Sequence, residues 1–119
     1  MAGGDVALEA LRAARALIGD PARWCRSAPA RKPTTRGAPG GEPCHATDPA
    51  ATRWCAAGAL CHVTGRRRAA PGFAELDHAA RTLFGEGIGR LNDRRETTHA
   101  MILRCFDEAI ARLEGHGPR

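Results

Sequence analysis

Apolar residues recur every three or four positions in the first part of the chain, which is typical of an amphipathic helix. The spacing predicts a helix over residues 5–18. Asp5 stands where a side chain caps a helix start, and Gly19 directly follows the expected end. A short helical turn should come next, because Asp20 and Pro21 have the residue types of a cap and a first helical position.

Two more helices are predicted by the same spacing in the second half of the chain. One begins at Pro71 and stops at Gly85. The other runs over residues 94–113 and carries an inward-facing stripe of His99, Leu103, Phe106, Ile110 and Leu113. Between these helices, residues 85–93 predict an irregular or extended connector that brings two large apolar side chains to the core.

The middle of the chain is apolar on nearly every side of a helix that begins at Asp48-Pro49 and ends at Gly65. A helix of this kind is buried on most sides, so we expect it to be the central element. Residues 26–47, just before it, are rich in Pro and Gly and predict a long loop. This loop allows a short hairpin around residues 36–42.

These elements predict an all-α fold, a single-domain bundle of four main helices with one long Pro/Gly-rich loop. The domain should occupy residues 1–119, with a flexible tail at 115–119. Its core contains unusually small side chains, because 24 residues are Ala while Leu, Ile, Val, Phe, Met and Trp together number 22. Small side chains bury little area each, which leaves homodimerisation as a way to bury more.

The charge balance and the aromatic content limit the classes of partner. The net charge is +5, from 17 Arg and one Lys against 13 acidic residues, and this permits contact with polyanions. The chain has no Tyr and only two Trp, so it offers few aromatic side chains on which bases could stack, and it has no helix-turn-helix spacing. Both observations argue against a nucleic-acid-binding protein. No stretch approaches the ~20 apolar residues of a membrane span, and we expect a cytoplasmic protein with reduced thiols.

Four residues could form a nucleophilic site. The tripeptide Arg-Trp-Cys occurs at residues 23–25 and again at 53–55, and only the second copy lies in the predicted central helix. There Cys55 could serve as nucleophile with His99 as its base, and Asn92 or Asp93 could orient the imidazole. The helix start beside His99 would favour an anionic substrate or oxyanion.

The same residues also have a structural interpretation. Asp93 and Glu96 match a capping box, which would engage Asp93 with the backbone. A Cys in an Ala-rich helix more often packs than reacts. The sequence therefore leaves open whether these residues are catalytic or belong to a core with caps.

A metal site is a weaker option, and the sequence indicates no cofactor. Cys44 and His45 form a Cys-His dipeptide in the long loop, and Cys61 and His62 form a second one. Structural zinc sites prefer ligands separated by two to four residues, whereas neighbours on a helix diverge by ~100°. Cys44 and His45 are therefore only weak candidates for metal ligands.

One known family resembles this chain. The stretch "DPAATRWCAAGAL", the later "LND" and "TTHAMILRCFDEAI" resemble a family of short bacterial proteins, abundant in actinomycetes, known only as a domain of unknown function. The likeness covers residues 8–113. Its most specific positions are Asp48-Pro49, Trp54-Cys55, Gly58-Ala59-Leu60, Asn92-Asp93 and His99. After the first Trp, family members often continue with a Gln-Gly type sequence, where this chain has Arg26-Ser27.

The resemblance implies no activity, so two functional hypotheses remain. The first is a small cysteine-dependent hydrolase or acyl-transfer accessory enzyme that uses Cys55 and His99. The second is a non-catalytic module that binds a small molecule or a protein, with the same residues in structural roles. Both hypotheses allow a small-molecule or anionic ligand.

Overall fold

The computed structural model describes residues 2–34, 37 and 40–115 of the 119-residue chain, so part of the tail expected at 115–119 lies outside it. The α-helices are α1 (Ala2–Leu17), α2 (Ala56–Thr64), α3 (Phe73–Phe84), α4 (Ile88–Asp93) and α5 (His99–Glu114). A 3-10 turn, η1 (Pro21–Arg23), follows α1. The strands β1 (Ala30–Lys32), β2 (Glu42–Cys44) and β3 (Arg53–Trp54) lie between η1 and α2.

The strands form an antiparallel sheet in the order β2-β1-β3, so the all-α prediction is wrong and the fold is mixed α/β. In the register, Ala30 pairs with Cys44 on one side and with Trp54 on the other. The hairpin that the loop allowed does form, from strands that flank the expected turn. The sheet escapes local pattern analysis because its strands have only two or three residues and none shows an alternating apolar run.

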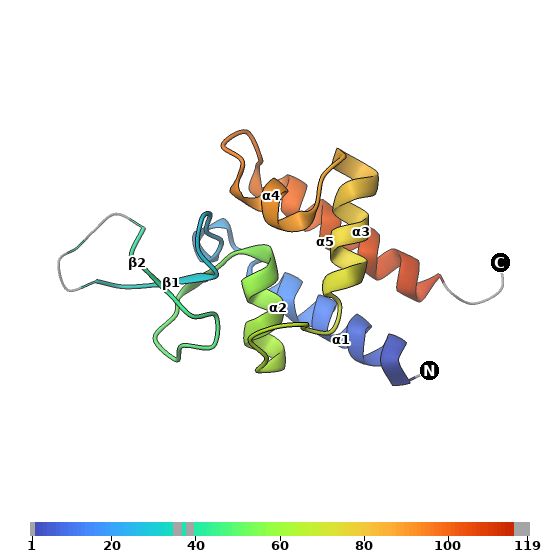
Figure 1. Cartoon of the computed structure of the whole chain (residues 1–119), viewed down its shortest axis with the longest axis horizontal. Coiled ribbons are helices and arrows are strands. Elements are labelled where there is room, and N and C mark those ends of the chain that lie inside the picture. Colours follow the sequence, from blue (N-terminus) through green and yellow to red (C-terminus); the bar gives the residue numbers. More distant parts are fainter. Residues whose placement is uncertain (1, 35–36, 38–39, 116–119) are drawn as a thin grey trace.

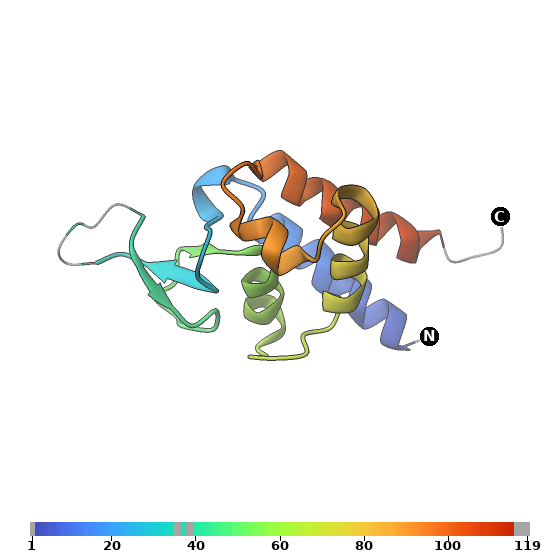
Figure 2. The same cartoon turned by 45° about the horizontal axis from the view of Figure 1, so that its top comes forward.

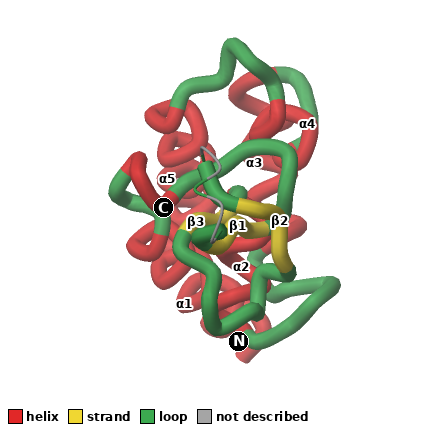
Figure 3. Tube along the Cα trace, turned by 90° about the vertical axis from the view of Figure 1, so that its left-hand side faces the viewer, coloured by secondary structure: helices red, strands yellow, loops and turns green. Residues whose placement is uncertain are grey.

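The β1–β2 hairpin extends from one end of the molecule, while α1 begins and α5 ends near the opposite end (Figure 1). Turning the view brings α4 forward, between the sheet and the C-terminal half of α3 (Figure 2). Seen from the hairpin end, the strands lie in front of the helices (Figure 3). No helix in the described ranges has the length and apolar character that crossing a membrane requires.

Several predicted boundaries are confirmed by the caps. The Asp20 side chain accepts a hydrogen bond from the Ala22 N–H at 2.9 Å, which starts η1 as expected. Gly65 and Gly85 end α2 and α3, both with the positive φ that glycine adopts at low cost. The helix predicted over residues 5–18 corresponds to α1, but α1 begins at Ala2, so Asp5 lies in its first turn and is not its N-cap.

Other boundaries differ from the prediction. The central helix begins at Ala56 rather than at Asp48-Pro49, because Arg53 and Trp54 pair with β1 as strand β3. The connector expected over residues 85–93 contains the short helix α4, which starts where the Asp77 carboxylate accepts the Ile88 N–H at 2.8 Å. The last helix starts after Thr98, whose side chain accepts the Met101 N–H, rather than at residue 94.

The hydrophobic core lies where α1, α2, α3 and α5 meet. Alanines make up nearly half of its buried positions, which allows the helices to approach closely. The large apolar side chains that it buries completely are Leu11, Ile18, Leu60, Leu76, Ile88, Leu91, Ile102 and Phe106. On α5 the buried face is Ile102, Cys105, Phe106 and Ala109, so only Phe106 of the predicted stripe is fully buried. The face is broader than one stripe because α5 packs against both α1 and α3.

Candidate functional site

The two Arg-Trp-Cys segments lie side by side at the edge of the sheet. Trp24 forms a parallel bridge with Trp54, and the Cys25 N–H donates to the Trp54 carbonyl at 3.1 Å. On the other side of β3, the Cys55 N–H donates to the Pro29 carbonyl at 3.1 Å. The segment from Cys25 to Pro29 therefore passes around the end of β3, and Cys55 lies between its two ends.

A single buried amide holds this junction together. The Asn92 side chain is 2% exposed, and its Oδ1 accepts from the Trp24 indole N–H at 2.8 Å and from the Ala56 N–H at 3.0 Å. Its Nδ2 donates to the Cys25 carbonyl at 3.1 Å and to the Asp93 carboxylate at 3.1 Å. One side chain from α4 thus connects the first Arg-Trp-Cys segment to the first turn of α2, which directly follows the second segment.

The second tryptophan fixes the loop that follows β2. The Trp54 indole N–H donates to the Ala46 carbonyl at 3.1 Å. The His62 ring nitrogen Nδ1 lies 2.8 Å from the same oxygen, so it carries the proton and donates. The Trp54 and His62 rings also lie together, with centroids 4.7 Å apart. These contacts hold residues 45–47 against α2.

Close backbone approach sets the opposite wall. A Cβ atom at Gly58 would lie 1.9 Å from the Pro29 carbonyl oxygen, so only glycine allows this contact. Pro29 therefore lies directly against the first turn of α2.

These walls enclose a pocket of about 440 Å³. Its lining comes from residues 27–29, residues 45–47, α2 with its N-cap Cys55, Arg67 in the connection after α2, and α4. Small and apolar side chains contribute most of the surface, and Cys55 and Cys61 both face it. Charged side chains lie at its edge, where Asp93 and Arg67 are both exposed. A volume in this range suits a small molecule.

Cys55 occupies the N-cap position of α2 on the pocket wall. Its Sγ accepts the Gly58 N–H at 3.2 Å. Burial raises the pKa of this thiol, and the N–H groups of Gly58 and Ala57, which favour the thiolate, do not compensate fully. The Cys55 side chain is therefore a neutral thiol near pH 7.

Comparison with protein families gives one result. A family of unknown function, DUF6197, matches residues 4–112, which is most of the chain. The chain belongs to this DUF6197 family. No curated protein and no solved structure matches it significantly. The match confirms the predicted resemblance to a domain of unknown function, while the bacterial and actinomycete origin and the cytoplasmic location stay predictions.

Three of the four predicted site residues lie together in this DUF6197 protein. Cys55, Asn92 and Asp93 all line the pocket. Asp93 does not cap α5, since it is the last residue of α4, and its Oδ1 accepts the Ser27 N–H at 2.8 Å. That bond supports Ser27 in a backbone conformation with φ 65°, which is unusual for a residue other than glycine.

His99 has a different environment. Its Nε2 lies 2.6 Å from the Ile18 carbonyl oxygen and so donates to it. Its ring centroid lies 5.8 Å from that of Trp24, which in turn binds Asn92. The Trp24 indole thus contacts both His99 and the amide that borders the pocket. Catalytic pairing of Cys55 with His99 stays a prediction. With Nε2 donating to Ile18, the imidazole would accept the thiol proton at Nδ1.

The weak metal candidates lie at the end of β2. Cys44 is the last residue of the strand, and His45 follows it at the pocket edge. Among the residues described, no three His, Cys, Asp or Glu side chains gather in a way that could hold a metal ion.

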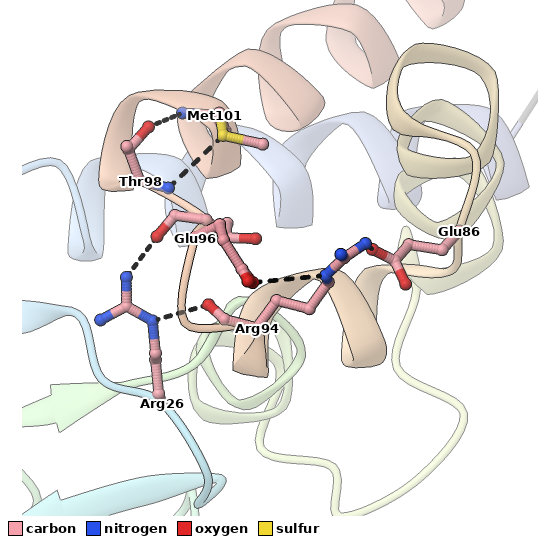
Figure 4. A network of polar contacts seen from close by, with 7 residues as sticks. Arg26, Glu86, Arg94, Glu96, Thr98 and Met101 are labelled. Carbon is pink, nitrogen blue, oxygen red and sulfur yellow. Dashed lines mark hydrogen bonds and ion pairs between the residues drawn. The ribbon is translucent and has the colours of Figure 1, made fainter.

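Arg26, which no local sequence pattern marks, fastens the loop between α4 and α5 (Figure 4). Its guanidinium lies over the Trp24 ring, 4.4 Å from the centroid, and donates to the carbonyls of Arg94 and Thr97. Arg94 in turn forms an ion pair with Glu86 at 2.6 Å. The only sequence signal was the departure from the family pattern after Trp24, because nothing local marks a contact with residues about seventy positions away.

Proposed function

We propose that this protein is a non-catalytic module that binds a small molecule in the pocket beside Cys55. The observation that carries the proposal is the pocket itself: about 440 Å³, lined mainly by small apolar groups, with the exposed charged side chains of Arg67 and Asp93 among its lining residues. Its walls are fixed by buried hydrogen bonds of Asn92 and Trp54, so the site exists before a ligand arrives. A preformed site loses less entropy on binding than a flexible one.

The charges at the edge favour a particular class of ligand. Arg67 supplies a positive charge, and the Asp93 carboxylate a negative one. A simple anion would meet Arg67 but would be repelled by Asp93. The ligand that fits best carries an acidic and a basic group on a compact apolar body, as a small zwitterion does.

The test is a titration that locates binding. Small amino acids, and carboxylates or amines of the same size, are added to ¹⁵N-labelled protein while amide shifts are recorded. We expect the zwitterions to shift the amides of Thr47, Ala57 and Gly58 most. Ala57→Leu should abolish these shifts, because Ala57 lines the pocket and the larger side chain fills it. Ala100→Leu, at an exposed position on α5, is the matched control and should leave them unchanged. Shifts that survive Ala57→Leu, or no shifts with any probe, would contradict the proposal.

A second candidate function is the cysteine-dependent hydrolase or acyl-transfer enzyme. The position of the Cys55 Sγ on the pocket wall, at the start of a nine-residue helix, favours it. In this mechanism Cys55 attacks a carbonyl carbon while His99 takes the thiol proton, and Asn92 or Asp93 orients the imidazole. The bond from the carbonyl carbon to the leaving group breaks, and the leaving group departs with the proton from His99. Water or another acceptor then takes the acyl group from the Cys55 sulfur.

Alkylation kinetics separate the two candidates. Because the Cys55 pKa is raised, a binding module should react slowly with iodoacetamide at pH 7, and the rate should rise as the pH passes 9. Cys55→Ala identifies the labelling that belongs to this thiol. Rapid labelling of Cys55 below pH 7 that slows in His99→Ala would instead support the enzyme.

A further inference from the structure

Cys25 and Cys55 occupy equivalent positions in the two Arg-Trp-Cys segments, and the fold places these positions next to each other. Each cysteine follows a tryptophan of the parallel bridge between Trp24 and Trp54. The Cys25 N–H bonds to the Trp54 carbonyl, whose carbon is bonded to the Cys55 nitrogen. Neighbouring strands lie ~4.8 Å apart, within the ~4.4–6.8 Å range of Cα separations that a disulfide spans.

The two side chains also share surroundings. Each cysteine directly follows a bridged tryptophan, and successive side chains of extended backbone point to opposite faces, so we expect both thiols on the face away from the tryptophans. Cys25 Sγ contacts the Ala28 carbonyl at 3.7 Å, and the next carbonyl, that of Pro29, accepts the Cys55 N–H. Burial raises the pKa of the Cys25 thiol, and the neighbouring Cys55 adds to this effect.

We propose that Cys25 and Cys55 are a redox-active pair that a hydroperoxide converts to an intramolecular disulfide. Both are free thiols in the structure. Cys55 reacts first, because it is half-buried and faces the pocket, whereas Cys25 is 7% exposed. Cys25 then resolves the intermediate. The proposal does not depend on a pocket ligand, since the oxidant is the only partner it needs.

The steps balance as a two-electron oxidation. The Cys55 thiolate attacks one peroxide oxygen, and the O–O bond breaks. Cys55 becomes a sulfenic acid, and the leaving oxygen takes up the proton that the thiol released. Cys25 sulfur then attacks Cys55 sulfur, the S–O bond breaks, and the departing hydroxide leaves as water with the Cys25 proton. The two thiols lose two electrons, which reduce hydrogen peroxide to two water molecules.

Reaction rate and product are controlled by different features. Burial raises the pKa of both thiols, that of Cys25 to about 11, so oxidation is slow at pH 7 and faster at higher pH. The second step is intramolecular, and its high effective concentration directs the sulfenic acid to a disulfide. Cys61 faces the same pocket but lies six residues after Cys55, ~9 Å along the helix axis, which is too far for a bond to Cys55.

Peptide mapping of the oxidised full chain tests the pair. The protein is treated with hydrogen peroxide at pH 8, the remaining thiols are alkylated, and a tryptic digest is examined by mass spectrometry. Cleavage after arginine places Cys25 in residues 24–26 and Cys55 with Cys61 in residues 54–66. We expect these two peptides to be linked, and the link to persist in Cys61→Ser. Cys105→Ser removes another buried thiol whose pKa is raised to about 11 and should leave the product unchanged.

Cys25→Ser gives a second readout. Without the resolving thiol, Cys55 should accumulate as a sulfenic acid that dimedone traps, and the linked peptide should disappear. The wild-type peptide map is sufficient to overturn the proposal, even if the Cys25→Ser variant does not fold. Any of three results in that map would contradict it: a disulfide to a different cysteine, a disulfide between two chains, or over-oxidised Cys55 beside unmodified Cys25.

Discussion

The helical region, α1, α3 and α5, and the pocket region, which comprises η1, the three strands, α4 and the first turn of α2, are stabilised in different ways. In the helical region, fully buried Leu11, Leu76 and Phe106 pack together, and ion pairs such as Arg15–Asp107 lie outside on the surface. In the pocket region, buried hydrogen bonds of Asn92 and Trp54 connect segments with little regular structure.

The difference follows from what each region contains. Regular helices satisfy their own backbone groups, so they need only apolar contacts to associate. The pocket region brings irregular backbone into the interior, where each unpaired N–H or C=O would cost about 1–3 kcal/mol. Its polar side chains therefore act as substitutes for secondary structure. Such side chains fix a pocket wall in position, which apolar packing alone does less well.

The largest expected effect comes from Asn92→Ala. The change leaves the Trp24 indole N–H, the Ala56 N–H and the Cys25 carbonyl without their partner, which should cost about 3 kcal/mol or more in unfolding free energy. Urea denaturation measures the total. Amide hydrogen exchange shows which part of the chain loses stability. We expect faster exchange at the Cys25 and Ala56 amides and little change in the amides of α5. A loss of protection spread evenly through both regions would show that the Asn92 hydrogen bonds do not stabilise the pocket region separately from the helical region.

Gly58→Ala should have the next largest effect. The new Cβ would meet the Pro29 carbonyl oxygen at 1.9 Å, and the resulting shift of the pocket wall should cost about 1–3 kcal/mol. Gly89→Ala on α4 is the matched control, because its Cβ would meet nothing within 4 Å. There we expect a gain of about 0.5–1 kcal/mol, from the higher helix propensity of alanine. Equal effects of the two changes in thermal unfolding would show that the contact with Pro29 is not tight.

Arg112→Ala, in the helical region, should have the smallest effect. It removes an i,i+4 ion pair with Glu108 at 2.8 Å, which is partly exposed and worth about 0.3–0.5 kcal/mol. Salt should reduce this difference further, because exposed charges are screened. A cost of more than ~1 kcal/mol in urea denaturation would mean that surface charge, and not apolar packing, stabilises this region.

The sequence predicts the helical region well and the pocket region poorly, for a physical reason. Helix α3 depends on local periodicity and on a glycine stop at Gly85, all within one stretch of chain. The start of α2 depends on pairing between Trp54 and Ala30, which no local pattern contains. Asp48 looked like its cap, but that side chain instead accepts the Ala50 N–H at 2.8 Å in a separate turn.

The candidate site shows the same division. Cys55, Asn92 and Asp93 stood out as parts of a nucleophilic site, a thiol and side chains that could orient its base, and the fold gathers them at one pocket. The contacts of Pro29 and Arg26 could not be foreseen, because both act through backbone atoms of distant residues. The all-α prediction failed in the same region, where short strands depend on partners far along the chain.

The placement of the two tryptophans gives each region its own optical signal. The chain has no Tyr, and both indoles belong to the pocket region, each against a histidine ring. Intrinsic fluorescence should therefore follow the melting of this end alone, while far-ultraviolet circular dichroism is dominated by the helices. Coincident transitions by the two methods would establish a single cooperative unit, and an earlier loss of fluorescence would reveal that the end with the pocket opens first.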